Sequence, residues 1–540
     1  MKKILLCAVF LPLVLNAQED YKGRVGINTT TPQATLDISK VAVSPTMPAD
    51  KPQGVLFPEL TTAERLAFSS NTKKGTLIYN KDKNCIEMYK GLINGVHEWT
   101  CTNTNAGSEI SNPSAPATAT LEAVQDIKWI AFKHDGKNYL VQGSNIMETG
   151  IANEEEITVN IPYSSALPTD GAYTAYEQTL ALKNESGYMQ DFKLSYPAGN
   201  FAGATGTIQA KLKNVSGAVY YPALDPLDGI YRNAIGNANA YTISLNGSST
   251  TTLKVKTLTG IPDRCFDKTT SECVGYGENV KEHNFVYLPI TGPDGRVWLN
   301  NNLGADYAKV GSPWFDPTYQ AGALDYTDTS SAVLLSNPTA DQIKMDWRAY
   351  GSLFQWQRNP DGHELMTWSS STGGTPKYAT IATTLSDSWT TPNHNNFIVG
   401  TSSTYWGWVN DTLDAASTQK DLWQSSGTGK TNPCPSGYYV PTHDEQVALH
   451  NAITGQNVGN SDSSSYLPAM WNERVLRLPT NGYRYKSDGS INYQGIFGIL
   501  WSSVQHSPYS RYLWFNSYDS FTGSSTERSL AHSVHCIKDN

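Results

Sequence analysis

The sequence has little charge, and neither sign dominates it. Only 16% of its 540 residues are Asp, Glu, Lys or Arg, and the formal net charge is −9. No basic stripe is present, which argues against a nucleic-acid partner. No apolar run reaches the roughly 20 residues that a transmembrane helix needs. The abundant Gly, Ser, Thr, Asn and Tyr are instead typical of exported proteins built from short strands and polar turns.

The sequence also lacks common motifs of catalysis and metal binding. It has no Cys-x-x-Cys, and no Gly-x-Ser-x-Gly that would mark a nucleophile elbow. His443 and His450 flank two acidic residues, but their spacing is not the His-Glu-x-x-His of zinc hydrolases, so we interpret them as surface charges on a helix. We therefore expect no enzyme activity, no cofactor and no metal. An exported hydrolase is a remote alternative, because a carboxylate pair cannot be located without a fold.

The first residues predict export. Lys2 and Lys3 precede an apolar run that ends at Leu15, and Ala17 offers a small residue for cleavage. Residues 1–17 are therefore predicted to be a signal peptide, and the mature protein is predicted to be extracellular or on the outer cell surface.

Cysteine usage agrees with an oxidising compartment. Removal of Cys7 with the signal peptide leaves six cysteines, which permit fifteen pairings. Short spacings favour two local bridges and leave one long-range bridge. The predicted structural pairs are Cys85 with Cys101, Cys265 with Cys273, and Cys434 with Cys536.

The length predicts about three domains in a mostly β, multidomain protein. Alternating apolar residues between 121 and 260, with a hairpin signal at Asp135-Gly136, predict an antiparallel sandwich with one wet face per sheet. We describe its architecture as immunoglobulin-like and its role as a spacer. The predicted order is a β-rich module at 18–105, a linker at 106–120, the sandwich at 121–260, a connector at 261–282 and a C-terminal domain at 283–540.

The N-terminal module has three recognisable segments, at 25–38, 54–65 and 75–80. Together they resemble a tail-fibre-like module of bacterial surface proteins. The resemblance implies an attachment or trimerising role, so we expect a homo-oligomer formed through this module. Thr61 and Glu64 predict a capping box that opens a short helix.

The C-terminal domain is rich in tryptophan and carries ordered signatures. The signatures are Trp298–Gly304, Tyr350–Trp356, Asn432–Thr442, Leu478–Arg484, Leu500–Ser503 and Ser533–Ile537. In this order they resemble the Fibrobacter succinogenes major paralogous domain family. The resemblance implies an α+β, C-type-lectin-like fold in which Cys434 is bonded to Cys536. Two residues depart from the family pattern, Gln446 in place of Trp and His535 in place of Arg.

Carbohydrate binding is the leading specific hypothesis, because exposed aromatic rings stack on sugar rings. The segment we expect to carry it comprises Tyr405, Trp406, Trp408, Asn410 and Asp411. Its ending is superficially like a Ca²⁺ loop, so Ca²⁺ is a secondary expectation. The alternative is that these aromatics fill the core of a helix-poor domain.

These observations predict an exported surface-binding or adhesion protein whose partner is a surface glycan or protein. A structural surface or fibre component without a small ligand is the alternative.

Overall fold

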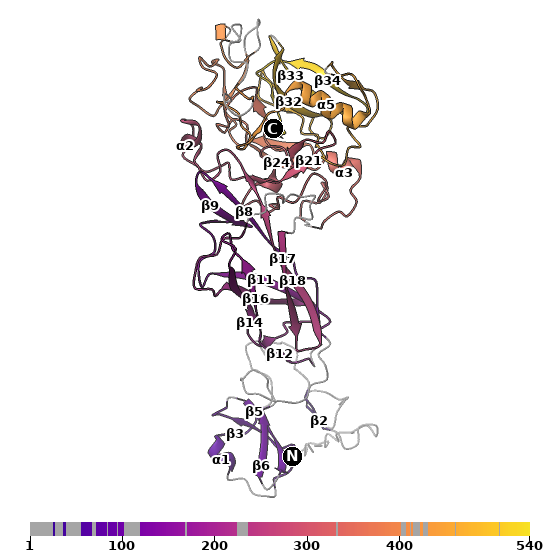
Figure 1. The fold of residues 1–540 in the computed structure, drawn as a ribbon. Helices are drawn as coiled ribbons and strands as arrows, with labels where there is room; N and C mark the ends of the chain where they lie inside the picture. The colour runs from indigo at the N-terminus through magenta and orange to yellow at the C-terminus, as the bar shows by residue number, and fades with distance from the viewer. Residues whose placement is uncertain are drawn as a thin grey trace, which may run out of the picture. The chain divides into compact units, whose positions relative to one another are not determined.

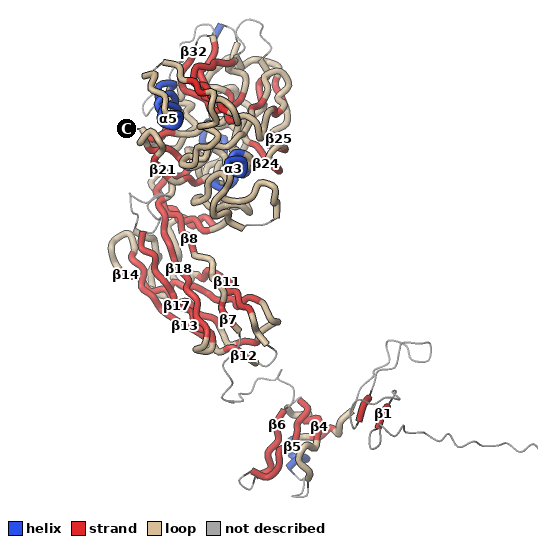
Figure 2. Tube along the Cα trace, turned by 90° about the vertical axis from the view of Figure 1, so that its right-hand side faces the viewer, coloured by secondary structure: helices blue, strands red, loops and turns tan. Residues whose placement is uncertain are grey.

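The structure is a computed structural model. It describes residues 25–27, 36–38, 56–66, 72–83, 85–93, 96–101, 119–167, 170–223, 236–330, 333–400, 407–410, 412–413, 422–424, 430–459, 461–506 and 508–539. Over these residues the protein is mostly β, with several sheets and few short helices (Figure 1, Figure 2). The chain divides into two compact units, Met1–Pro113 and Ser114–Asn540. The predicted signal peptide and residues 106–118 of the predicted linker lie outside the described residues.

The first unit contains a four-stranded sheet and one short helix. The predicted capping box is present, because the Glu64 amide donates to Thr61 Oγ1 at 3.1 Å and the Thr61 amide donates to Glu64 Oε2 at 2.7 Å. Its elements are the parallel pair β1 (Val25–Ile27) and β2 (Leu36–Ile38), the helix α1 (Thr62–Leu66), and a sheet ordered β3 (Glu59–Leu60), β4 (Leu77–Asn80), β5 (Cys85–Ile93) and β6 (Val96–Cys101).

The second unit begins with a sandwich of two five-stranded sheets. One sheet has the order β10 (Asn145–Glu148), β9 (Lys137–Gln142), β8 (Ile127–His134), β18 (Ser249–Thr259), β17 (Gly236–Leu245). The other has the order β13 (Tyr176–Lys183), β14 (Met189–Tyr196), β16 (Gly206–Asn214), β11 (Glu156–Ser164), β7 (Thr120–Leu121), and a small ribbon pairs β12 (Ala172–Tyr173) with β15 (Gly199–Asn200).

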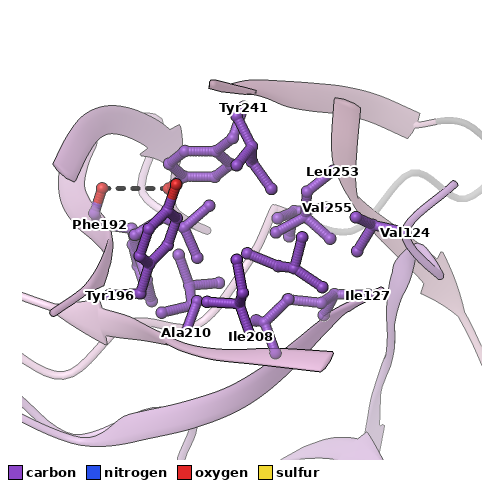
Figure 3. Close-up of a cluster of buried hydrophobic side chains, with 14 of the residues drawn as sticks. Val124, Ile127, Phe192, Tyr196, Ile208, Ala210, Tyr241, Leu253 and Val255 are labelled. Atoms are coloured by element: carbon purple, nitrogen blue, oxygen red, sulfur yellow. Dashed lines mark hydrogen bonds between the residues drawn. The ribbon is translucent and has the colours of Figure 1, made fainter. Parts of the chain in front are cut away.

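The sandwich core is formed by apolar side chains of the two sheets, which pack against each other (Figure 3). In β16 the buried Ile208, Ala210 and Leu212 alternate with exposed residues, as predicted for a strand with one wet face. The Tyr241 hydroxyl of one sheet donates to the Phe192 carbonyl of the other at 3.0 Å. The core is thus apolar apart from its tyrosine hydroxyls, which are hydrogen-bonded.

One part of the sandwich departs from the expectation of a wet face. The β8–β9 hairpin turns at Asp135 and Gly136, both with positive φ, as the sequence predicted. The face of this hairpin that points away from the sandwich core is also buried, because Ile130 and Phe132 pack against Phe266 and Val286, which follow the sandwich in the chain. A continuous apolar run in β8, rather than an alternating one, is the sequence signal of this double burial.

The C-terminal region, which we define as residues 261–539, consists of small sheets joined by long loops. Three four-stranded sheets have the orders β21-β22-β36-β28, β23-β35-β30-β31 and β29-β34-β33-β32, and two-stranded pairs are β19-β20, β24-β25 and β26-β27. The strands are β19 (Ile261–Pro262), β20 (Val286–Tyr287), β21 (Pro289–Thr291), β22 (Val297–Leu299), β23 (Phe354–Gln355), β24 (Met366–Ser370), β25 (Gly373–Pro376), β26 (Ile381–Ala382), β27 (Phe397–Ile398), β28 (Tyr438–Tyr439), β29 (Ser464–Ser465), β30 (Tyr483–Arg484), β31 (Ile491–Asn492), β32 (Gly498–His506), β33 (Tyr509–Phe515), β34 (Ser520–Thr526), β35 (Ala531–His532) and β36 (Ile537–Lys538).

The helices of this region are short and well capped. They are α2 (Thr270–Val274), η2 (Asp306–Ala308), α3 (Ala340–Lys344), η3 (Trp347–Ala349) and α5 (His443–Thr454). A capping box formed by Thr442 and Glu445 opens α5, which packs beside β32, β33 and β34 (Figure 1). His443, Glu445 and His450 are buried there, so the prediction that they are surface charges is wrong. His450 lies between the Ser463 and Ser520 hydroxyls, at 2.8 Å from each.

The structure contains three disulfides, and each is a predicted pair. They are Cys85–Cys101, Cys265–Cys273 and Cys434–Cys536.

The two residues that differ from the pattern named above, Gln446 and His535, both make buried hydrogen bonds. The Gln446 amide donates to the Leu500 and Trp501 carbonyls, and His535 Nδ1 lies 2.9 Å from Asn302 Oδ1.

Candidate functional site

The predicted ligand segment does not form an exposed aromatic surface in its described part. Trp408 is fully buried, and its Nε1 donates to the Trp356 carbonyl at 2.8 Å. Its ring meets Trp389 edge to face, with centroids 5.2 Å apart. The prediction that Trp408 stacks on a ligand is therefore wrong. Tyr405, Trp406 and Asp411 lie outside the described residues.

Most tryptophans of the C-terminal region belong to its core. Nine are buried: Trp298, Trp347, Trp356, Trp368, Trp389, Trp408, Trp423, Trp471 and Trp501. The core-filling alternative therefore holds for these nine side chains.

The other described residue of the predicted segment is Asn410, and its polar atoms are already engaged. Its amide nitrogen donates to Asp387 Oδ1 at 2.7 Å, and its Oδ1 accepts from the Leu413 amide at 3.0 Å. Each polar side-chain atom of Asn410 therefore has a partner within the protein.

The C-terminal region contains a buried ion cluster. It consists of Arg358, Asp361, His363, Glu364 and His283, all almost or completely inaccessible. Arg358 Nε donates to Asp361 at 2.8 Å, and His283 Nε2 lies 2.8 Å from Glu364 Oε1. Burial alone would raise the pKa of Glu364, but the hydrogen bonds from the two histidines outweigh burial and hold that pKa well below its ordinary value. The cluster is therefore a paired ionic network.

Three members of this cluster, Asp361, His363 and Glu364, have ligand atoms close enough together for a metal. The tautomer of His363 argues against that role. The Gln355 backbone N–H donates to His363 Nε2 at 3.0 Å, so in the neutral ring the proton is on Nδ1, which lies 2.7 Å from Asp361. Metal-bound histidines usually donate from the second nitrogen, whereas this one accepts. We interpret the cluster as structural.

Cys85, Glu87 and Cys101 also lie close together, but they do not suit a metal. The two sulfurs are bonded to each other, so neither is a thiolate. Glu87 is paired with Arg65 at 2.6 Å and with Lys83 at 2.9 Å. This trio therefore stabilises the first unit.

A tyrosine-lined pocket of about 340 Å³ lies elsewhere in the C-terminal region, and we call it the tyrosine pocket. Its volume is within the range of about 300–1,000 Å³ that is usual for small-molecule sites. The pocket is lined by residues of β30, β32, β33, β34 and β35 and of the loops that follow β30 and β34. Its aromatic and aliphatic lining comprises Tyr483, Tyr485, Ile499, Tyr512 and Leu530.

A tight hairpin sets two of these tyrosines at the mouth of the pocket. β30 pairs with β31, and the Tyr485 amide donates to the Ser490 carbonyl at 2.7 Å. The turn contains Asp488 and Gly489, and Gly489 has a φ of +68°. Tyr483 is half-buried and Tyr485 is 37% exposed.

His532 forms an unusual part of the pocket lining. It is 2% exposed, and neither ring nitrogen has a hydrogen-bond partner among the described residues. Its ring packs against Trp501, Tyr512 and Tyr483 at centroid distances of 4.2, 5.4 and 6.0 Å. Burial lowers the pKa of His532 to about 3, so the imidazole is neutral at physiological pH. Both nitrogens are buried, so His532 contributes its ring to the aromatic wall of the pocket.

The charged groups of the pocket neutralise each other. Lys486 Nζ lies 2.7 Å from Glu527 Oε1, and the Thr526 hydroxyl donates to the other carboxylate oxygen at 3.0 Å. Glu527 is the one carboxylate in the described lining, whereas most glycoside hydrolases use two. The arrangement suits binding of an uncharged ligand by ring stacking and hydrogen bonds, and it does not suit that hydrolytic mechanism.

A second pocket of about 290 Å³ lies between the sandwich and the loop at 315–317. Its ionised groups are already paired, Lys128 with Asp316 at 2.5 Å and Asp126 with Lys256 at 2.5 Å. It contains no buried side chain without a hydrogen-bond partner among the described residues. It is the weaker candidate.

Sequence reasoning did not find the tyrosine pocket. Leu478–Arg484 and Leu500–Ser503 were singled out as signatures, but nothing local connected Tyr483 with Tyr512 and His532. The available signal was the Tyr-x-Tyr pattern before the Asp488-Gly489 turn, which predicts two side chains on one face of a hairpin.

The comparisons with known proteins bear on the first unit. A family model described as "Phage tail like trimerisation region" matches residues 26–115. No curated protein and no solved structure matches the chain. Among the described residues, no helix is long and apolar enough to cross a bilayer. The N-terminal 26–115 segment is therefore similar to a phage-tail-like trimerisation region.

Proposed function

We propose that this protein is an exported surface-binding protein of the adhesion type, which trimerises through residues 26–115 and binds carbohydrate in the tyrosine pocket. The observation that carries the proposal is the tyrosine wall of the pocket, which Tyr483, Tyr485 and Tyr512 line together. Aromatic faces stack on the C–H faces of sugars, and tyrosine hydroxyls can donate to and accept from sugar hydroxyls.

The similarity of residues 26–115 to a trimerisation region supports the oligomeric part of the proposal. Three disulfides support an oxidising, extracellular location. Three copies of a weak sugar site on one trimer would give avidity for a surface that carries many copies of the same glycan.

The resemblance of the C-terminal region to the Fibrobacter succinogenes major paralogous domain family is part of the proposal. The Cys434–Cys536 bond and the capped helix α5 are consistent with the C-type-lectin-like fold that this resemblance implies. We propose a non-catalytic role, which the bridged cysteines and the single carboxylate of the pocket support.

The second candidate is a structural surface or fibre component without a small ligand. The burial of Trp408 and of most other tryptophans in this region favours it, because those rings serve the core.

A glycan array probed with the full chain separates the two candidates. The proposal expects binding to a subset of uncharged glycans and its loss in Tyr512→Ala, with Tyr188→Ala as the control because Tyr188 is 73% exposed on the sandwich. Blank arrays, or binding unchanged by Tyr512→Ala, would contradict the pocket assignment. Sedimentation of the full chain tests the oligomer, where a mass three times that of one chain is expected and a monomer would contradict it.

A further inference from the structure

An aromatic row continues from the tyrosine pocket across the neighbouring sheet. Consecutive ring centroids lie between 5.0 and 5.7 Å apart along the whole row. The aromatic row comprises, in spatial order, Tyr483, Tyr493, Phe497, Trp514, Phe521 and Tyr466.

The sheet register explains why the row is continuous. Trp514 in β33 lies directly opposite Phe521 in β34, and their rings stack with an interplanar angle of 19°. Phe521 in turn is the register partner of Ser464 in β29, which Tyr466 follows by two residues. Leu513 and Phe515 are fully buried, whereas Trp514 between them is only partly buried, so the row follows the outer face.

The row keeps large aromatic side chains in contact with solvent. Tyr466 is 76% exposed and Tyr493 is 50% exposed, and each rests on a neighbouring ring of the row. A contiguous exposed apolar surface of this kind usually marks a binding site. Since supporting rings hold the exposed tyrosines, less conformational entropy is lost when a ligand binds them.

Three charged or titratable side chains beside the row contact one another. Arg511 Nη1 and His443 Nε2 each lie 3.0 Å from Asp462 Oδ1. The Trp514 Nε1 donates to the Ser524 hydroxyl at 2.8 Å. The surface therefore offers aromatic rings together with neutral polar groups such as the Ser524 hydroxyl.

From these observations we infer that the row binds a linear, uncharged polysaccharide, with one end of the bound segment in the tyrosine pocket and the chain extending toward Tyr466. This inference rests on the proposed sugar binding and adds the length and class of the ligand. Each sugar ring has an apolar face for a ring of the row and hydroxyls for the neighbouring polar side chains. A proline-rich peptide is the competing ligand for an aromatic groove, but the hydroxyls of Tyr466, Tyr483 and Tyr493, which can both donate and accept, favour a ligand rich in hydroxyls.

The test is isothermal titration calorimetry of the full chain with cello-, malto- and manno-oligosaccharides, each as a ladder from disaccharide to octasaccharide. We expect affinity for one ladder to increase with length. The double variant Tyr466→Ala/Phe521→Ser should weaken octasaccharide binding about tenfold and leave disaccharide binding unchanged. Tyr512→Ala should weaken binding of every length, and Tyr188→Ala should change nothing.

The outcomes separate the inference from the proposed function. Disaccharide binding with no dependence on length, or octasaccharide binding unaffected by the double variant, would overturn the aromatic row and leave the pocket intact. Absence of binding to every ladder and to the glycan array would overturn both, as would binding of a polyproline peptide without any sugar. Circular dichroism melting curves confirm that each variant is folded.

Discussion

The sandwich and the C-terminal region satisfy their backbone groups in different ways. Strands of the sandwich such as β8 and β18 have 8 and 11 residues, so long ladders pair most N–H and C=O groups. Many strands of the C-terminal region, such as β23 and β30, have 2 residues. The loops between them leave buried carbonyls that need donors from side chains.

Tryptophan, arginine and lysine side chains supply these donors. The indole Nε1 atoms of Trp356 and Trp501 donate to the Ser502 and Phe354 carbonyls at 2.9 and 2.7 Å. Lys344 Nζ, which is fully buried, donates to the Leu478 carbonyl at 2.8 Å. The tryptophan-rich composition thus accompanies the short strands, since several of these rings fill the core and also donate to a backbone carbonyl.

The largest expected effect comes from breaking the buried ion cluster with Asp361→Asn. The variant keeps the shape of the side chain but leaves the buried Arg358 without its carboxylate. We expect a loss of about 4 kcal/mol in the free energy of unfolding, because removal of one partner of a buried pair costs about 3–5 kcal/mol. Urea unfolding measures it, with the exposed Asp387→Asn as the control. Equal stability of the two variants would show that the cluster is not structural.

The sandwich counterpart is Leu194→Ala, which removes only apolar contacts. Leu194 is fully buried between the sheets, so we expect a loss of about 3 kcal/mol from the missing side chain and the cavity it leaves. The same urea titration measures it. Leu167→Ala is the control, because Leu167 is 50% exposed. A loss below about 1 kcal/mol would mean that the sandwich core is looser than its burial indicates.

Sequence reasoning found the regular parts of the molecule better than its site, for a physical reason. Strands such as β11 and β16 have a period of two that a local pattern reveals. The Asp135-Gly136 turn and the Thr61 capping box are signals within a few adjacent residues. The disulfide pairs follow from the spacing of six cysteines. The tyrosine pocket instead joins residues from 483 to 532 that lie on two different sheets, and no local pattern shows which strands of the two sheets meet.

Burial was also misjudged where composition was the guide. Trp408 was predicted to be exposed because tryptophan stacks on sugars, but its indole N–H satisfies a core carbonyl. The polar start of α5 suggested a surface helix, but sheet strands cover it and serine hydroxyls satisfy His450. In both cases the deciding partner lies far away in the sequence.

A smaller, pH-dependent effect is expected at His532, which is neutral in the fold. Its pKa of about 3 lies below the unfolded value of about 6.5, so the unfolded state takes up a proton that the folded state cannot. Stability from this group is therefore lost as the pH falls below 6.5, by about 2 kcal/mol between pH 7 and pH 5. His532→Phe removes this term, and urea unfolding at the two pH values measures the difference. The exposed His506→Gln is the control, and unchanged pH dependence in His532→Phe would contradict the assignment.

The smallest expected effect is at an exposed ion pair of the sandwich. Lys193 Nζ lies 3.3 Å from Glu177 Oε2, and the two side chains are 38% and 72% exposed. Solvent screens such a pair, so Glu177→Gln should change the free energy of unfolding by no more than about 0.5 kcal/mol. Thermal and urea unfolding both measure it, and 1 M salt should remove the remaining difference. A loss comparable to that of Asp361→Asn would remove the distinction between the regions, because it would show that charge pairs stabilise the sandwich as strongly as they stabilise the loop-rich region.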